Sequence, residues 1–219
     1  RSARGGAGGM LWRGLGGSAN TACEGKVAPL ADIGTIDNEL MLADLDSLGK
    51  RVDNLTKKAK GNDKDAKEQL DLVNRALVLL REGKPARFLE RQPEEERAFA
   101  MLGLLTSKPV LDVCNVEEGA SAEGNNFSNR VMEHAVREGA VAVAISAKIE
   151  SEIATLSRAE RAEFLDTLGL EEAGLDRLIR AGYQLLDLIT YFTVVPKEAR
   201  AWTIDPGPKA PAAAGAIQT

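Results

Sequence analysis

Two short polar motifs hold the side chains best suited to bind a ligand, Asn115-Val-Glu-Glu118 and Ser146-Ala-Lys148. The carboxamide of Asn115 offers a donor and an acceptor in one plane, which can pair with the N7 atom and the exocyclic group of a purine. The carboxylate of Glu118 only accepts hydrogen bonds, which suits the N1–H and N2–H donors of guanine. The two motifs predict a site for a nucleotide base, formed by Asn115, Val116, Glu118, Ser146, Ala147 and Lys148.

Each motif directly follows a predicted β-strand, at 110–114 and at 141–145. A helix predicted at 127–138 joins the strands, and the apolar run at 141–145 is typical of a strand buried on both faces. Ligands of open α/β sheets bind beyond the carboxyl ends of the strands, so both motifs are expected at one edge. An Asn-x-x-acid turn followed by a Ser-Ala-Lys turn is the base-recognition arrangement of P-loop GTPase-like domains. The alternative for Asn-x-x-Glu alone is an ordinary capped turn.

Two segments with heptad spacing precede the predicted sheet. Gly61 and Asp63 lie between them and are residue types that end one helix and cap the next. The pattern predicts an antiparallel helical hairpin, and two ordinary helices of a bundle are the alternative. A further helix is expected from Pro93 to about 106. The apolar heptad positions are Met41, Leu45, Leu48, Val52, Leu55 and Ala59, followed by Ala66, Leu70, Val73, Leu77 and Leu80.

The remaining pattern also alternates helices and strands. Helices are expected at 158–168 and 175–186, and strands at 189–194 and 199–204. Strands that alternate with helices indicate a parallel or mixed sheet with helices on its faces. The predicted fold class is therefore α/β, preceded by a helical hairpin.

Five lysines surround the turn of the predicted hairpin, and they could contact the phosphates of an RNA. The alternative is a solvated tip, because acidic residues at 63, 65 and 68 are interspersed among them. The possible RNA-contacting residues are Lys57, Lys58, Lys60, Lys64 and Lys67.

Other candidate chemistry is sparse. His134 is the only histidine and has no cysteine or carboxylate at ligand spacing, so we predict a structural role and no metal site. Cys114 could be a redox handle beside the base site, although a buried strand cysteine is the simpler interpretation. Cys23 and Cys114 are far apart in sequence, which favours a reducing cytoplasmic location over a disulfide framework. No catalytic residue is predicted.

The composition narrows the class of protein. The chain has 219 residues, of which 44% are hydrophobic and 28% charged, with a formal net charge of -5. These values exclude collagen-like, disulfide-scaffold and wholly disordered classes. No apolar run is long enough to span a membrane. A mildly acidic chain is not built for bulk phosphate-backbone binding, so we expect no DNA partner.

Residues 1–22 differ from the rest because they hold seven glycines, three arginines and no acidic residue. They show no apolar period and no secretory signal, so a disordered leader is expected. A real tail, a cloning remnant and a wrongly translated upstream region would all fit.

From Glu24 to Thr219 the chain resembles the YchF subfamily of Obg-like ATPases. The match covers about nine tenths of the sequence and is dense, so its specificity is high. The stretches that carry it are Gly25–Ile33, Asn38–Leu45, Lys57–Gly61, Leu105–Pro109, Asn115–Glu118, Ile145–Lys148, Glu160–Phe164, Gly174–Gly182, Ile189–Thr193 and Arg200–Ile204.

The resemblance implies a P-loop GTPase-like nucleotide domain interrupted by a helical coiled-coil domain and followed by a small TGS domain. It also implies binding and hydrolysis of ATP, often in preference to GTP, with magnesium, and association with ribosomes. The expected division is a leader at 1–22, a helical domain at 23–106, the C-terminal part of the nucleotide domain at 107–195 and the start of a truncated TGS domain at 196–219. Asn115 and Glu118 match the base motif of the family, and Ser146 to Lys148 match its companion turn.

The sequence also departs from the family. It contains no Gly-x-x-x-x-Gly-Lys-[Ser/Thr], the loop that binds the phosphates. It also lacks the switch segments that would position water and the metal ion. Asp112 stands where the family usually has an apolar or aromatic residue, and Cys114 replaces a small residue beside Asn115. We therefore expect a chain that retains base recognition but does not hydrolyse ATP alone. The alternative is a non-catalytic module that binds the ribosome or a protein through its hairpin, and a third possibility is a truncation product without function.

Overall fold

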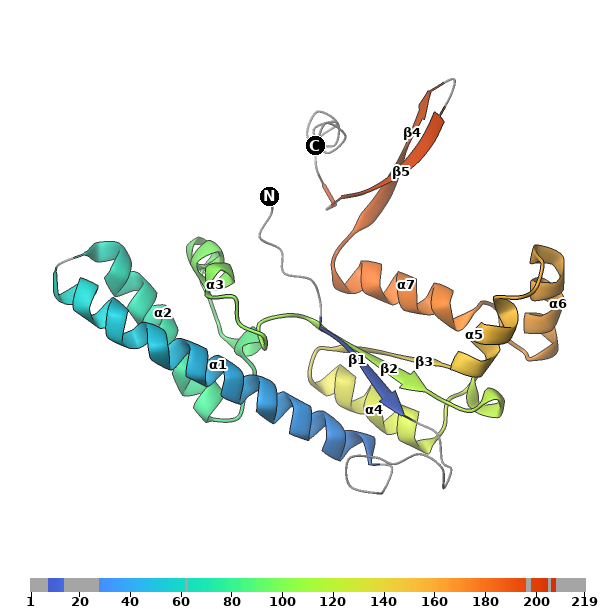
Figure 1. Ribbon diagram of the computed structural model, residues 1–219, viewed down its shortest axis with the longest axis horizontal. Helices are drawn as coiled ribbons and strands as arrows, with labels where there is room; N and C mark the ends of the chain where they lie inside the picture. Colours follow the sequence, from blue (N-terminus) through green and yellow to red (C-terminus); the bar gives the residue numbers. More distant parts are fainter. Residues whose placement is uncertain (1–7, 14–27, 62, 196–197, 205, 208–219) are drawn as a thin grey trace.

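The computed structural model describes residues 8–13, 28–61, 63–195, 198–204 and 206–207. Its elements confirm the expected α/β class, with helices surrounding a small parallel sheet (Figure 1). The sheet has the order β1-β2-β3, with strands Gly8–Arg13, Val110–Asn115 and Val141–Ile145. All three are parallel, so their carboxyl ends lie at one edge.

Helices cover both faces of this sheet. Alternate side chains of β2 and β3 pack against α4 (Asn126–Arg137) on one face, and the others pack against α7 (Gly174–Leu185) on the opposite face. The strand expected at 141–145 is confirmed between these layers. Of its five residues only Ala144 is fully buried, because β3 is the last strand of the sheet in the described part of the chain.

The expectation of a disordered leader at 1–22 needs correction for six residues. Residues 8–13 form β1 and pair in parallel with the whole length of β2. The sequence signal was missing because this glycine-rich segment does not alternate apolar and polar residues, whereas the unpaired backbone edge of β2 offers hydrogen bonds to any extended segment. The other residues of the expected leader lie outside the described ones.

The predicted hairpin is present in α1 (Pro29–Lys60) and α2 (Lys64–Arg81), which run side by side in Figure 1. Gly61 follows the first helix, and the Asp63 side chain accepts a hydrogen bond from Ala66 N at 3.1 Å, which caps the second. The predicted apolar seam forms the core of the hairpin, and its best buried members are Met41, Leu48, Ala66, Val73, Leu77 and Leu80.

A buried carboxylate joins the hairpin to the sheet. Asp44 of α1 is 2% exposed and accepts hydrogen bonds from Leu105 N and from both N and Oγ1 of Thr106, at 2.7 to 2.8 Å. The segment it holds leads directly into β2. Three short helices lie between α2 and this segment, η1 (Ala86–Phe88), η2 (Pro93–Glu95) and α3 (Glu96–Leu102). The helix expected to reach about 106 therefore ends earlier, at Gly103, which has a left-handed φ of 65°.

After β2 the chain forms a turn at η3 (Glu118–Ala120), and after β3 it forms α5 (Ala147–Ile153) and α6 (Arg158–Thr167). No pattern in the sequence predicted α5, because seven residues are too few to show a helical apolar period. These two helices share a small apolar cluster of Ile149, Ile153, Leu165, Leu170 and Ala173.

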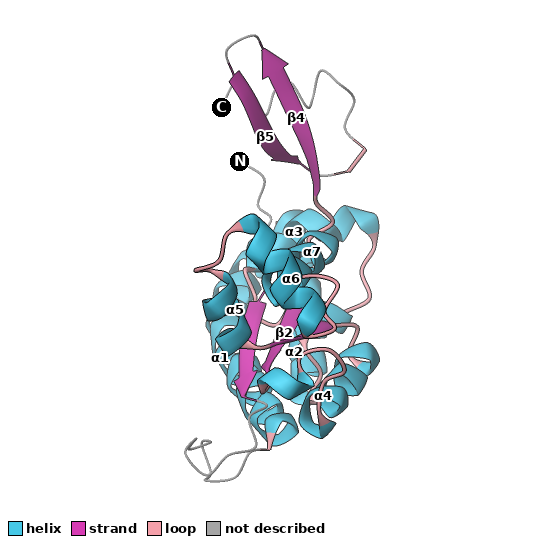
Figure 2. Ribbon diagram, turned by 90° about the vertical axis from the view of Figure 1, so that its right-hand side faces the viewer, coloured by secondary structure: helices cyan, strands magenta, loops and turns pink. Residues whose placement is uncertain are grey.

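The last two strands form a sheet of their own. β4 (Ile189–Val195) pairs antiparallel with β5 (Glu198–Ile204), and this hairpin stands apart from the helices (Figure 2). The domain boundary expected between residues 195 and 196 would divide this hairpin, so it needs correction. The backbone pairing places β4 with β5 and not with the parallel sheet. The boundary expected at 106/107 stays a prediction.

Candidate functional site

The two polar motifs meet at the carboxyl edge of the parallel sheet. Asn115 is the last residue of β2 and lies opposite Ile145, the last residue of β3. The backbone N–H of Ala147 donates to Oδ1 of Asn115 at 3.0 Å. This bond joins motifs that are 32 residues apart in sequence and fixes the plane of the Asn115 carboxamide. Nδ2 of Asn115 and the second lone pair of Oδ1 remain able to bind a ligand.

Two residues beside Asn115 and Ala147, Val116 and Ser146, are buried at this edge. Val116 is 1% exposed, and its N–H donates to the carbonyl of Ile145 at 2.8 Å. Ser146 is also buried and takes the N-cap position of α5, but it makes no capping bond, and its Oγ has no hydrogen-bond partner among the described residues. Ala147 and Lys148, in contrast, are exposed to solvent.

The charged members of the two motifs pair with each other. Lys148 forms a salt bridge with Glu118, and both side chains are partly exposed to solvent. The hydrogen bond to the Glu118 carboxylate, and next the negative charge of that group, raise the pKa of Lys148 above its ordinary value. The carboxylate expected to select guanine is therefore already engaged by a cation from the second motif.

The departures from the family pattern lie beneath the site. Asp112 and Cys114 of β2 are both buried, at 3% and 1% exposure. Burial, and next the neighbouring charge of Asp112, raise the pKa of the Cys114 thiol to about 11. Cys114 belongs to the apolar cluster beneath α4, which agrees with a buried strand cysteine and not with a redox handle.

Sequence reasoning missed the residues that support the site from α7. The N–H of Gly174 donates to Oε1 of Glu150 in α5 at 2.7 Å, and Nη2 of Arg177 donates to the carbonyl of Ser121 at 3.2 Å. The only signal in the sequence was a glycine at the start of a strongly amphipathic helix, since partners more than 20 residues apart leave no periodic pattern.

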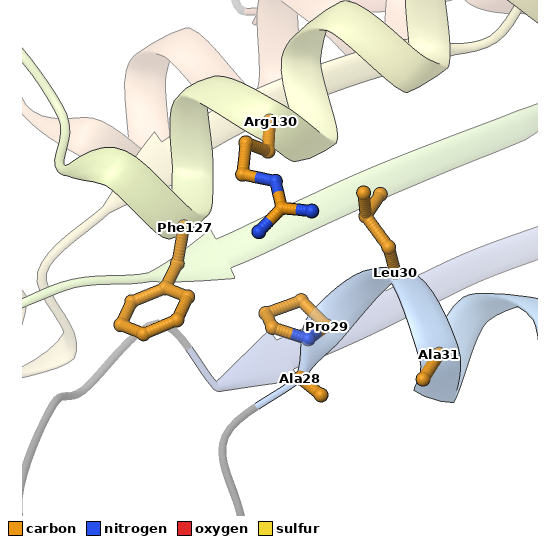
Figure 3. A pocket seen from close by; sticks show the side chains of 6 residues that line it. All are labelled: Ala28, Pro29, Leu30, Ala31, Phe127 and Arg130. Atoms are coloured by element: carbon orange, nitrogen blue, oxygen red, sulfur yellow. The ribbon is translucent and has the colours of Figure 1, made fainter.

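A pocket of about 210 Å³ lies near the same edge, between the first turn of α1 and the first turn of α4 (Figure 3). The guanidinium of Arg130 and the ring of Phe127 point toward Pro29 across this pocket. None of the residues of the two polar motifs lines it, so it is a neighbour of the site and not a part of it.

The predicted RNA-contacting lysines lie at the far end of the molecule, around the turn between α1 and α2 (Figure 1). All five are exposed, and they are not brought together with the base site. Lys64 lies 3.8 Å from Glu68 in the next turn of α2, a loose contact between two exposed groups.

The described residues include no group of three or more His, Cys, Asp or Glu side chains that could hold a metal ion. These residues therefore offer no all-protein site for the magnesium that the resemblance implies. None of the helices in the described segments is long and apolar enough to cross a membrane.

The chain is similar to known proteins over most of its length. A family model described as "YchF-GTPase_C: Protein of unknown function (DUF933)" matches residues 188–219. A Haemophilus influenzae protein named ribosome-binding ATPase YchF is 48% identical over 195 residues, covering 89% of this chain and 53% of the relative. The Bacillus subtilis protein of the same name is 44% identical over 201 residues, covering 91% of this chain and 55% of the relative.

A solved structure gives the same assignment. The Schizosaccharomyces pombe YchF GTPase matches with a TM-score of 0.85 and 27% identity, covering 97% of this chain and 58% of that one. The chain thus spans about half the length of the relatives it matches. Because sequence and structure agree on these relatives, the chain belongs to the YchF family.

Proposed function

We propose that this chain binds a purine nucleotide, ATP in preference to GTP, through contacts of Asn115, Val116, Glu118 and Ser146–Lys148 with the base. The observation that carries the proposal is the 3.0 Å hydrogen bond from Ala147 N to Oδ1 of Asn115. It assembles one binding edge from two motifs at the carboxyl ends of adjacent parallel strands, where ligands of α/β sheets bind. The names of the relatives, ribosome-binding ATPases, support the ligand class.

The hydrogen-bond pattern of this edge favours adenine. Asn115 can donate from Nδ2 to purine N7 and accept at Oδ1 from the adenine N6 amino group, the paired contact by which asparagine recognises adenine. Guanine presents the acceptor O6 at that position and needs a donor instead. One backbone donor of the second motif, the N–H of Ala147, is already bonded to Asn115.

The charge arrangement acts in the same direction. Guanine gains from a free carboxylate that accepts from its N1–H and N2–H groups. In this chain Glu118 is paired with Lys148, so guanine must compete with a cation for that carboxylate. Both side chains are partly exposed and such ion pairs are weak in water, so GTP is disfavoured but not excluded.

Binding and hydrolysis are separate questions for these 219 residues. Phosphoryl transfer depends on groups that surround the phosphates, and the printed sequence has no Gly-x-x-x-x-Gly-Lys-[Ser/Thr]. We propose that the 219-residue chain by itself binds the base without hydrolysing ATP. Magnesium-dependent release of phosphate by the purified chain, lost on Asn115→Ala, would overturn this statement.

The test of base binding is a titration of the ¹⁵N-labelled chain with adenosine, guanosine and cytidine, followed by amide chemical shifts. Adenosine should shift the amides of Val116 and Ala147 at the lowest concentration, guanosine at a higher one, and cytidine least. Asn115→Leu should remove these shifts, whereas Asn54→Leu on the hairpin should leave them unchanged. Equal responses to all three nucleosides would contradict the proposal.

A second function, contact with the ribosome in the cytoplasm, is favoured by the hairpin tip. Five lysines are exposed around the turn after α1, and RNA phosphates are the partner that such a cluster would fit. The names of the relatives support this partner class. This function needs no nucleotide chemistry and corresponds to an interaction module.

The test is co-sedimentation with ribosomes over a range of salt concentrations. Reversal of three tip charges, Lys57→Glu, Lys58→Glu and Lys60→Glu, should weaken binding and flatten its dependence on salt, because fewer counterions are released. A matched reversal elsewhere, Lys50→Glu with Lys84→Glu and Lys108→Glu, should have a smaller effect. Equal losses in the two triple variants would show that net charge alone controls the binding.

A further inference from the structure

The helix α7 is part of neither base-binding motif, but it forms hydrogen bonds with residues that closely follow each of them. Gly174, in its first turn, donates its N–H to Oε1 of Glu150 at 2.7 Å. Glu150 lies in the first turn of α5, and its own N–H donates to the carbonyl of Ser146 at 3.0 Å. The start of α7 is thereby connected to the Ser146–Lys148 motif.

The close approach of the two helices depends on the absence of a side chain at residue 174. A Cβ atom there would lie 2.9 Å from Cγ2 of Ile145 and 2.9 Å from Oε1 of Glu150. Ile145 is the last residue of β3 and pairs with Asn115. The first turn of α7 therefore packs directly behind the edge that holds the Asn115 carboxamide.

One turn later, Arg177 reaches the other motif. Its Nη2 donates to the carbonyl of Ser121 at 3.2 Å, and the hydroxyl of Ser121 donates to the carbonyl of Glu118 at 2.6 Å. Ser121 is 4% exposed, so this short relay is screened from water. Through it, a cation on α7 fixes the turn that carries Glu118 and closely follows Asn115, the residue proposed to contact adenine.

We propose that Arg177 is a positioning residue for base recognition, which acts through Ser121 on the Glu118 turn while Gly174 holds the opposite motif. The inference rests on the proposed function, since it concerns the same base site. Its physical basis is preorganisation: a turn fixed before binding does not lose conformational freedom when the ligand arrives. Arg177 itself does not touch the base.

The test compares Arg177→Met with a matched control in the same helix, Arg180→Met. Arg180 pairs with Glu172 at the surface, and among the described residues it forms no hydrogen bond with either motif. Adenosine affinity is measured by amide shifts of the labelled full chain, and thermal unfolding is measured in parallel. Arg177→Met should weaken adenosine binding about fivefold, the equivalent of one lost charge-assisted contact, with a small change in Tm. Arg180→Met should weaken it by less than about twofold.

Two further variants separate positioning from general stability. Ser121→Ala keeps the carbonyl that accepts from Arg177 but removes the hydroxyl that donates to Glu118, so it should weaken adenosine binding about threefold. Arg177→Lys keeps a donor and should recover part of the affinity. In Arg177→Met and in Ser121→Ala, the amide chemical shifts of Glu118 to Ala120 should change even without ligand. Destabilisation elsewhere in the chain would not produce this change.

The outcomes distinguish the two proposals. If the wild-type chain shows no purine-dependent shifts, the proposed function and this inference both fail. If the wild type binds adenosine but Arg177→Met binds it equally well, only the positioning role fails. Equal losses in Arg177→Met and Arg180→Met would also overturn it, because the effect would then follow the charge of α7 and not the Ser121 contact.

Discussion

Among the single residues next to the site, the buried thiol of Cys114 has a reactivity that its surroundings keep low. Cys114 lies directly before Asn115 and is 1% exposed, and its pKa is raised to about 11 by burial and by the charge of Asp112. A thiol with this pKa is almost entirely protonated at neutral pH, and only the thiolate is nucleophilic. The cysteine beside the base site is therefore a packing residue.

This burial predicts slow alkylation of Cys114. In a Cys23→Ser variant, which leaves a single thiol, iodoacetamide at pH 8 should react about 100-fold more slowly with the folded chain than with the chain in urea. The pKa of Cys114 is higher in the folded chain than in the unfolded one. The contribution of this thiol to the free energy of unfolding is therefore fully present below about pH 9 and is lost as the pH rises toward 11. Equal alkylation rates in the two states would contradict the burial.

The Asp44 carboxylate should matter more for stability than any surface charge. It satisfies three donors of Leu105 and Thr106 while 2% exposed, so Asp44→Ala leaves buried N–H groups without partners. We expect a loss of about 3 kcal/mol in the free energy of unfolding, measured by urea denaturation. Asp46→Ala, two residues further along α1, removes only an exposed pair with Lys50 and should cost less than about 0.5 kcal/mol. Similar losses at the two positions would exclude a special role for Asp44.

At the scale of elements, the start of α7 is defined by space and not by helix propensity. A methyl group at Gly174 would overlap Ile145 and Glu150, whereas a methyl group at Gly182 meets no atom within 4 Å. Gly174→Ala should therefore destabilise the chain by about 1–3 kcal/mol through overpacking. Gly182→Ala should stabilise it by about 0.5–1 kcal/mol, because alanine is the better helix former. Thermal unfolding of the two variants gives opposite shifts in Tm if the packing controls the outcome.

The elements that the sequence predicted are those with local signals. Heptad spacing predicted the α1–α2 hairpin, and an apolar run followed by a polar motif predicted β2 and β3 with the base residues at their ends. Contacts between distant segments could not be predicted in this way. Arg177 and Ser121 are 56 residues apart, Asp44 and Thr106 are 62 apart, and β1 is defined by the free edge of β2 and not by its own composition. The places of the two polar motifs at the ends of β2 and β3 were therefore predictable, but the residues that position them were not.

At the scale of the whole molecule, the β4–β5 hairpin is the part with the weakest support. It has no third strand in the described part of the chain, and Phe192 and Val194 are 71% and 77% exposed. The hydroxyl of Tyr183 in α7 connects the hairpin to the body, through a hydrogen bond with Thr203 at 3.0 Å and a contact with Thr190. A two-stranded hairpin without an apolar cover is marginally stable in water.

Local opening should therefore separate this hairpin from the sheet. The free energy of opening, measured by native-state hydrogen exchange, should be near zero for amides of β4 and β5, and should approach the global value for amides of β2 and β3. Tyr183→Phe should accelerate exchange in the hairpin without moving the Tm of the body, because it removes the hydroxyl that contacts Thr203 and Thr190 of the hairpin. Equal protection of the two sheets would show that the hairpin is held by more than these contacts. Since Tyr183 lies on the same helix as Arg177, exchange in the Glu118 turn of the same variant also measures whether α7 transmits the motion of the hairpin to the base site.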